Sequence, residues 1–299
     1  MKVRIGYGLG TQAQQSGERF AALVDGLEQR GFDSLWLSER ISSDSVDPLI
    51  GIAVAAGRTT KLKFGTSVMV LPGRSPALVA KQLASLDVLS GGRMLPAFGL
   101  GVRDGAERQA FGVATEDRAA WFEEALPLIR RFWTGEPVDH DGTHFTYRGL
   151  AVRPRPVQDE FDIWLGGVAP SELRRTGRLA DGWLPSFTSP ADAPAKRKVI
   201  EEAADAAGRE IDPEHFGALV VYLRGAIPDR LAAAARARRP DLDPAEVFPV
   251  GMAGVRAMLE RFVEGGFSKF VLVPAQTPER WDEELDEVAS ELLPLQRTT

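Results

Sequence analysis

Residues 62–82 read LKFGTSVMVLPGRSPALVAKQ, and the way this stretch changes character along its length decides the fold class. Its first half, 62–71, is an apolar run of the kind that forms a buried strand, and a Pro-Gly turn follows it. From Pro76 onward the sequence is typical of a helix. A strand that passes directly into a helix is the repeating unit of parallel α/β folds. A buried strand is normally apolar to its end, so the polar residues Thr66 and Ser67 in its middle need a separate explanation.

The same alternation of strand and helix continues along the whole 299-residue chain. Eight apolar runs have the character of buried parallel strands, and most of them are followed by an amphipathic stretch. At this length, that pattern favours a closed (β/α)8 TIM barrel with insertions after some strands over an open doubly wound sheet. The runs are VRIGYGLG from residue 3, SLWLSE from 34, LKFGTSVMVL from 62, RMLPAFGLG from 93, FDIWLGG from 161, DGWLPS from 181, FGALVVYLRG from 216 and KFVLVPA from 269.

Two segments interrupt the alternation. Residues 134–160 are rich in Gly and Pro and do not have a helical pattern, and residues 226–250 have the pattern of an inserted helix framed by prolines. The Arg-rich part of the second segment is followed at once by acidic residues, which is typical of a solvated helix and not of a nucleic-acid-binding arm. Because there is no internal repeat and no low-complexity linker, we expect residues 1–299 to form a single domain with two insertions.

Composition excludes several classes of function. A net charge of −6 and a pI near 5.3 give no basic footprint for nucleic acid or for an anionic membrane, and the absence of cysteine excludes disulfides and thiolate chemistry. The three histidines, His140, His144 and His215, lack the spacing of a helical zinc site, so no metal is expected. The first residues do not resemble a signal peptide and no apolar run is long enough to span a bilayer, so the expected location is cytoplasmic.

The ends of the predicted strands are where function is expected, because active sites of such barrels are built at the carboxyl ends of the strands. Glycine and small polar residues gather there, in segments such as GLGTQ, LSER, GLGVRDG and ADGWLPS. Residues 164–167, WLGG, run into a predicted helix, and exposed N–H groups at a helix start bind phosphate. Paired glycines at a strand end are more often turn chemistry, so the pattern alone leaves both interpretations open.

Seven longer motifs add a further signal. They are GFDSLWLSER (31–40), GTSVMVLPGRSPALVAKQLASLDVLSGGR (65–93), ERQAFG (107–112), RAAWFEEALPLIRRFWTGEPVDHDGTHF (118–145), IWLGG (163–167), RLADGW (178–183) and GMAGVRAMLERFVEGGFSKFVLVP (251–274). In this order and at this spacing, they cover essentially the whole chain and resemble the bacterial luciferase-like monooxygenases, in particular the branch that uses the deazaflavin coenzyme F420. The resemblance implies a (β/α)8 barrel that binds flavin mononucleotide (FMN) or the deazaflavin at its C-terminal end.

The resemblance also implies roles for individual residues. It places a cis peptide bond between Ser67 and Val68, in a bulge that presses against the middle ring of the cofactor. The alternative is that the polar residues only fill a bulge beside a turn. The resemblance further places Glu39 and Arg40 beside the cofactor as candidate catalytic residues. The cofactor-binding residues that it implies are Ser67, Val68, Met69, Gly99, Gly101, Val102, Trp164, Leu165, Gly166 and Gly167, of which the last four would receive the phosphate and the ribityl chain.

Arg40 departs from the family pattern, because many hydride-transferring relatives have His at this position. Arginine is a permanent cation and cannot act as a base. Arg40 is expected to pair with Glu39, to hold an anionic substrate or to stabilise charge on the reduced ring, and an exposed ion pair is the alternative. A neighbouring cation would lower the pKa of Glu39 and make it a weak base. The protein is therefore not expected to be an efficient dehydrogenase of secondary alcohols.

Three functions remain open at this point. The favoured one is an oxidoreductase that uses bound coenzyme F420 for hydride transfer to or from a small organic substrate, more as a reductase than as an alcohol dehydrogenase. The second is an FMN-dependent two-component monooxygenase that receives reduced flavin from a partner reductase. The third is a non-catalytic protein that binds flavin or deazaflavin. A homodimer and a flavin or F420 reductase partner stay open as interactions, and fold alone cannot choose between these functions.

Overall fold

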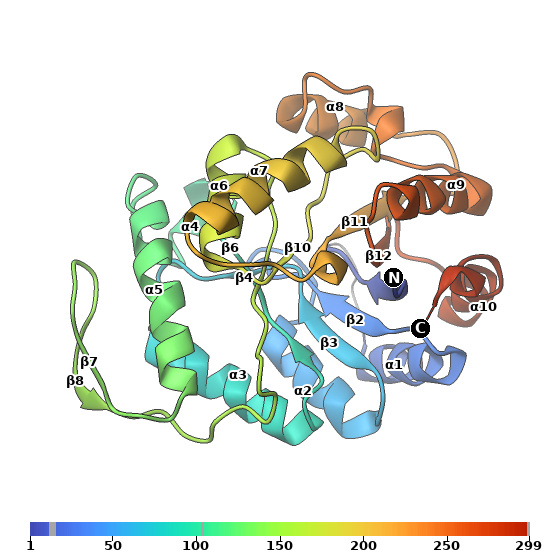
Figure 1. Cartoon of the computed structure of the whole chain (residues 1–299). Helices are drawn as coiled ribbons and strands as arrows, with labels where there is room; N and C mark the ends of the chain where they lie inside the picture. The colour runs from blue at the N-terminus through green and yellow to red at the C-terminus, as the bar shows by residue number, and fades with distance from the viewer. Residues whose placement is uncertain (12–15, 103–104, 298–299) are drawn as a thin grey trace.

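The strands form a closed ring of parallel pairs, as expected for a (β/α)8 barrel. The computed structural model describes residues 1–11, 16–102 and 105–297, and Figure 1 shows the strands surrounded by helices. Two of the eight predicted strands are each split in two, and a single bridge between Trp183 and Phe216 joins the last gap in the ring. In ring order the strands are β1 (Arg4–Gly8), β2 (Ser34–Leu37), β3 (Lys63–Thr66) continued by β4 (Met69–Val70), β5 (Met94–Leu95) continued by β6 (Ala97–Gly99), β9 (Trp164–Leu165), β10 (Gly182–Trp183), β11 (Gly217–Tyr222) and β12 (Lys269–Pro274).

Helices follow the strands along the chain and cover the outside of the ring (Figure 1). Local signals set their ends: the Ser16 hydroxyl accepts a hydrogen bond from Arg19 N at the start of the first helix, and Gly31 ends that helix with φ 80°. The helices are α1 (Gly17–Arg30), α2 (Pro48–Arg58), α3 (Pro76–Ser90), α4 (Gly105–Arg108), α5 (Arg118–Trp133), α6 (Pro170–Leu179), α7 (Ala193–Ala206), α8 (Asp229–Arg238), α9 (Gly251–Glu264) and α10 (Trp281–Leu292).

The split strands explain the polar residues in the opening stretch. The chain leaves regular pairing at Ser67 and Val68, and the neighbouring strand is interrupted at Pro96, which has no N–H to donate. The Thr66 hydroxyl bridges this irregular region, because it donates to Ala97 O at 2.6 Å and accepts from Ala97 N at 2.9 Å. A threonine therefore supplies hydrogen bonds that the backbone ladder lacks here. The Ser67–Val68 peptide bond is cis, which confirms the prediction.

Two tryptophans fill the inside of the ring, and glycines on the neighbouring strands make room for them. A Cβ added at Gly65 would lie 2.1 Å from Trp36 Cε3, and one added at Gly182 would lie 2.5 Å from Trp164 Cε3. Both indoles are almost completely buried. The glycines in these strands are thus required by close packing, and the barrel interior below the strand ends is a filled core.

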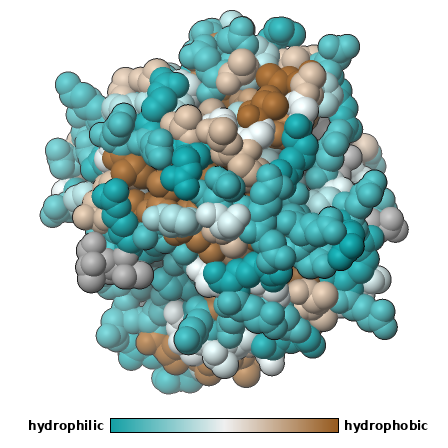
Figure 2. Space-filling view, turned by 90° about the vertical axis from the view of Figure 1, so that its right-hand side faces the viewer, coloured by the Kyte–Doolittle hydropathy of each residue, from teal (hydrophilic) through white to brown (hydrophobic). Residues whose placement is uncertain are grey.

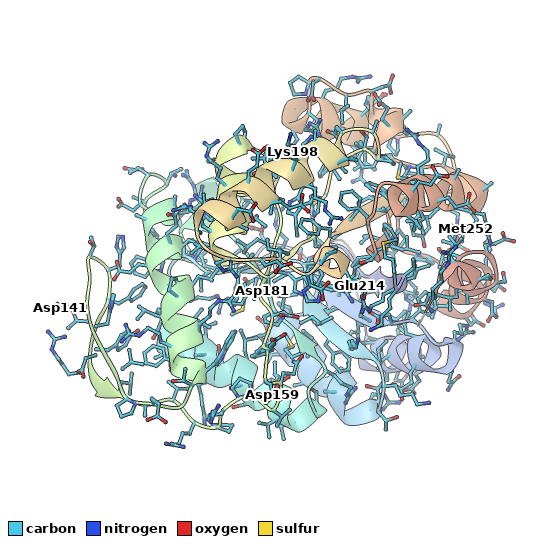
Figure 3. The ribbon with its side chains drawn as sticks, in the orientation of Figure 1. Asp141, Asp159, Asp181, Lys198, Glu214 and Met252 are labelled. Carbon is cyan, nitrogen blue, oxygen red and sulfur yellow. The ribbon has the colours of Figure 1, made fainter. Side chains whose placement is uncertain are left out.

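The two interrupting segments differ in structure, and the hairpin in the first was not predicted. Residues 134–160 contain an antiparallel hairpin of β7 (Val138–Asp141) and β8 (Thr146–Leu150), which projects from the barrel at α5 in Figure 1. Asp141 marks its exposed outer edge in Figure 3. Residues 226–250 contain α8, whose Ala235 packs in a small apolar cluster with Val247, Phe248 and Leu223, the residue after β11.

The outer surface is mainly hydrophilic on the face that carries α9 and α10, with hydrophobic residues gathered in small patches (Figure 2). Within the described residues, no helix has both the length and the apolar character needed to cross a membrane.

Candidate active site

A cavity of about 220 Å³ opens at the carboxyl ends of the strands, on the side of the barrel where the sequence placed function. Six of the ten predicted cofactor-binding residues line it: Ser67, Val68, Gly99, Leu165, Gly166 and Gly167. The opposite wall comes from the ends of β10 and β11 and from the helices α5 and α6. Segments separated by about a hundred residues therefore meet at one concave site, as the resemblance implied.

The Ser67–Val68 segment is held in the cavity wall by its neighbours on β2. Ser67 N donates to Leu37 O at 2.8 Å, and the Ser38 hydroxyl donates to Ser67 O at 2.9 Å. The Ser38 and Ser67 hydroxyl oxygens lie 3.2 Å apart. Ser38 was not predicted, although it is part of the LSER segment at a strand end. Its role is to fix the Ser67 carbonyl, which leaves the Ser67 side chain at the cavity.

Glu39 has a different partner from the one expected. Its carboxylate accepts a hydrogen bond from Val70 N at 2.7 Å and forms an ion pair with Arg74. Arg74 Nε in turn donates to Val70 O at 2.9 Å, so the pair holds both backbone polar groups of Val70. Burial raises the pKa of Glu39 above its usual value, and this outweighs the lowering by Val70 N–H and Arg74. The expected lowering of this pKa by Arg40 is therefore wrong, because burial is the larger effect and the paired cation is Arg74.

Arg40 pairs with Glu107 and not with Glu39. Its Nε lies 2.9 Å from Glu107 Oε1, and the same oxygen accepts hydrogen bonds from Ser42 N and from the Ser42 hydroxyl at 3.2 and 2.6 Å. Burial would raise the pKa of Glu107, but the hydrogen bonds from Ser42 and Arg40 outweigh it and lower the pKa. Arg40 therefore ties the loop after β2 to α4. Neither Glu39 nor Arg40 lines the cavity.

Four other predicted residues lie near the cavity without lining it. Met69 points into the core between the sheet and the helices, and Trp164 packs inside the barrel with Leu184. Gly101 and Val102 belong to the loop after β6, where the Val102 carbonyl accepts from Arg118 Nη1 at 2.9 Å. Their predicted contact with a cofactor stays a prediction.

The start of α6 adds two charged residues that were not predicted. Glu172 and Arg175 both line the cavity beside Gly166 and Gly167. Glu172 Oε2 accepts from Val168 N and Ala169 N, at 2.9 Å each. The available signal was the spacing of Glu172 and Arg175, three residues apart in the first turns of a helix that follows WLGG, which puts them on one face.

The histidines lie away from the cavity. His140 Nε2 lies 2.9 Å from Glu124 Oε1 on α5, and the His144 ring packs at a tilt against Trp121 of the same helix, so both belong to the packing of the hairpin. His215 lies just before β11, with Nδ1 3.1 Å from Asp181 O, at the amino end of the strands. Asp181 and the neighbouring Glu214 are marked in Figure 3. None of the described residues forms a cluster suited to hold a metal ion.

Comparison with known proteins agrees with this geometry. The family model described as luciferase-like monooxygenase matches residues 2–293. The chain is 30% identical over 227 residues, 72% of its length, to "Putative coenzyme F420-dependent oxidoreductase Rv3520c" of Mycobacterium tuberculosis, and 31% identical over 183 residues, 61% of its length, to 5,10-methylenetetrahydromethanopterin reductase of Methanolobus tindarius. The matches span 64% and 54% of those two relatives.

Solved structures give the same fold. The structure of the coenzyme F420-dependent tetrahydromethanopterin reductase from Methanopyrus kandleri superposes with a TM-score of 0.79 at 21% identity, covering 99% of this chain and 100% of that one. At this identity the likeness establishes the (β/α)8 barrel alone. The match of the family model over nearly the whole length establishes more: the chain belongs to the luciferase-like monooxygenase family.

Proposed function

We propose that this protein is an oxidoreductase that uses coenzyme F420 for hydride transfer to a small organic substrate. The observation that carries the proposal is the convergence of Ser67, Val68 and the Leu165–Gly167 segment on one cavity at the carboxyl end of the barrel. The names of the two curated relatives, an F420-dependent oxidoreductase and a methylenetetrahydromethanopterin reductase, support the choice of hydride chemistry.

The cavity wall suits a flat ring system with a phosphate-bearing tail. Its apolar part includes Val68, Leu165 and Leu219. At the lining glycines no side chain stands between the backbone and the cavity. A Cβ added at Gly99 would lie 2.5 Å from Val68 Cγ2, and one added at Gly166 would lie 3.2 Å from Leu184 O. Side chains at these positions would therefore collide with or crowd the cavity wall and change its shape.

In this proposal the bound deazaflavin supplies the hydride donor or acceptor, and the chain supplies position and environment. Ser38 and the Glu39–Arg74 pair hold the Ser67–Val68 segment against the ring. The apolar wall would keep water away from the face of a bound ring, so that the substrate could take its place there. We also propose that the chain is one domain, and that the 226–250 insertion forms part of the rim, since Arg239 Nη1 donates to Phe187 O at 3.0 Å beside the cavity residue Ser186.

Reduction is favoured over alcohol oxidation because no suitable base faces the cavity among the described residues. Glu39 and Glu107 are engaged by cations and do not line the cavity, Arg40 cannot accept a proton, and the three histidines lie elsewhere. Glu172 does line the cavity, but its Oε2 already accepts hydrogen bonds from Val168 N and Ala169 N. Removing a proton from an alcohol needs such a base within hydrogen-bond reach. Hydride delivery to an activated alkene, imine or carbonyl carbon can instead be completed by a proton from water.

The alternative proposal is an FMN-dependent monooxygenase supplied by a partner reductase, and a non-catalytic cofactor-binding protein is a third. The test is calorimetric titration of the protein with F420 and with FMN. Binding of F420 at micromolar concentration, weakened in Gly166→Val but not in the exposed control Gly57→Val, supports the proposal. Preference for FMN supports the monooxygenase, and binding of neither overturns all three proposals.

The direction of hydride transfer is tested with two panels of candidate substrates. Reduced F420 is offered with enones, imines and ketones, and oxidised F420 with secondary alcohols and sugar phosphates. The expected result is turnover of the first panel. Turnover confined to the alcohols would contradict the assignment as a reductase.

A further inference from the structure

The start of α6 is an anion-binding position that already holds an anion of its own. The N–H groups of Val168 and Ala169 lie directly before Pro170, the first residue of α6, at the end of the helix that favours negative charge. Both donate to Glu172 Oε2, each at 2.9 Å. The carboxylate also lies directly on Gly167, since a Cβ added there would be 2.5 Å from the same oxygen. A negative side chain thus occupies part of the place that the fold offers to phosphate.

Arg175, one turn further along α6, is the cation of the same wall. Its side chain is only 10% exposed, and it reaches the cavity beside the Phe122 ring. Only its Nε has a protein partner, Glu123 Oε1 at 2.9 Å, and within the described chain the two terminal nitrogens have none. A largely buried guanidinium with unused donors at a cavity is suited to hold an anionic group there.

The two side chains together set how much negative charge the site accepts. Arg175 shares Glu123 with Arg178, so without Glu172 these three side chains carry a net charge of +1, which adds to the positive end of the helix dipole and would attract a second negative charge on the ligand. With Glu172 present, the side-chain charges cancel and mainly the helix dipole remains. The desolvation free energy of an anion rises steeply with its charge. A doubly charged group therefore has a larger desolvation penalty than a singly charged one, and at this site its attraction to the protein is hardly stronger.

We propose that Glu172 makes this cavity select a singly charged phosphodiester over a doubly charged phosphomonoester, and so select F420 over FMN. The inference rests on the proposed function, since it concerns the cofactor of that site. The phosphate of F420 is a diester with one charge. The phosphate of FMN is a monoester with a second pKa near 6, so it is mostly doubly charged at pH 7.5.

The experiment measures what the phosphate contributes to binding, by calorimetry at pH 7.5. FMN is compared with riboflavin, and F420 with its phosphate-free deazaflavin chromophore. Glu172→Gln keeps an oxygen for the Val168 and Ala169 N–H groups and removes the charge. Glu260→Gln, on the exposed side of α9, removes one charge elsewhere and serves as the matched control.

In the wild type, the phosphate of FMN is expected to improve affinity by less than about threefold. In Glu172→Gln, the factor by which the FMN phosphate improves affinity should rise by about tenfold or more, the change in binding constant that corresponds to one pKa unit. The factor contributed by the F420 phosphate should change by less than about threefold. Glu260→Gln should behave as the wild type. An equal change for both cofactors, or no change, overturns the role of Glu172 and leaves the proposed function standing. Failure of all four ligands to bind overturns the proposed function itself.

Discussion

Replacing Glu39 by Ala tests whether the Glu39–Arg74 pair holds the strand bulge in place. The change removes two charge-assisted hydrogen bonds, one from Val70 N at 2.7 Å and one from Arg74. Such bonds contribute about 1.5–3 kcal/mol each, or about 3–6 kcal/mol together. The Glu39 side chain is only 4% exposed, and burial raises its pKa, so burying this charge has a desolvation penalty in the wild type. The alanine variant avoids that penalty, which offsets part of the stability lost with the hydrogen bonds. We expect a net decrease in the free energy of unfolding of about 2–3 kcal/mol.

The decrease is measured by urea denaturation followed by tryptophan fluorescence. Asp25→Ala, which breaks the exposed pair with Arg58, is the control and should change stability little. Because the bulge forms the cavity wall, cofactor affinity should fall in Glu39→Ala as well. A variant as stable as the wild type, with unchanged cofactor affinity, would refute the idea that this pair holds the bulge.

Two further predictions concern stability. Burial would raise the pKa of Glu28, but hydrogen bonds from the N–H groups of residues 60–62 outweigh it and lower the pKa to about 2. This stabilisation is present above the pKa of about 4.3 in the unfolded chain and is lost as the pH falls towards 2. Glu28→Gln should therefore lower the free energy of unfolding by about 1 kcal/mol at pH 7. It should also flatten the measured dependence of that free energy on pH between 5 and 2. Gly177→Ala should destabilise the protein by about 1–3 kcal/mol in thermal unfolding, because the added Cβ would lie 2.3 Å from Ile200 O on α7. The control Gly254→Ala should not destabilise it, because no atom lies nearer than 3.8 Å to the added Cβ. Equal melting temperatures of the two variants would contradict this account of the α6–α7 contact.

Periodicity and strand-end chemistry were enough to predict the barrel. All eight runs became strands, and the segments GTSV and WLGG met at one cavity. These features follow from short-range signals: apolar runs, turn residues, and the rule that parallel strands end on the same side. The cis bond at Ser67–Val68 followed from resemblance alone, because no local signal distinguishes it from an ordinary bulge.

The ion pairs could not be predicted in this way. Glu39 and Arg40 are adjacent in sequence, and their pairing was one of the alternatives for Arg40, yet each has a partner from a different loop. Glu39 pairs with Arg74, which follows the next strand, and Arg40 pairs with Glu107, which follows the one after that. Which side chains meet across the mouth depends on the tilt and stagger of the strands, and a single sequence does not specify these quantities. The same limit applies to Trp164, whose layer inside the barrel depends on strand stagger.

The arrangement of charges at the mouth connects the fold to the proposed chemistry. In the described part of the chain, the carboxylates around the cavity all have positional roles: Glu39 holds the bulge, Glu107 ties two loops, and Glu172 closes the start of α6. Glu39 and Glu107 do not line the cavity, and Oε2 of Glu172, which does, is already taken up by the Val168 and Ala169 N–H groups. A site built this way can orient a ring and exclude water, but it does not offer a ready proton acceptor. Solvent or the substrate must then give or take the proton of the reaction. Reduction meets this requirement more easily, because water can supply a proton, whereas oxidation of an alcohol needs a positioned base to remove one.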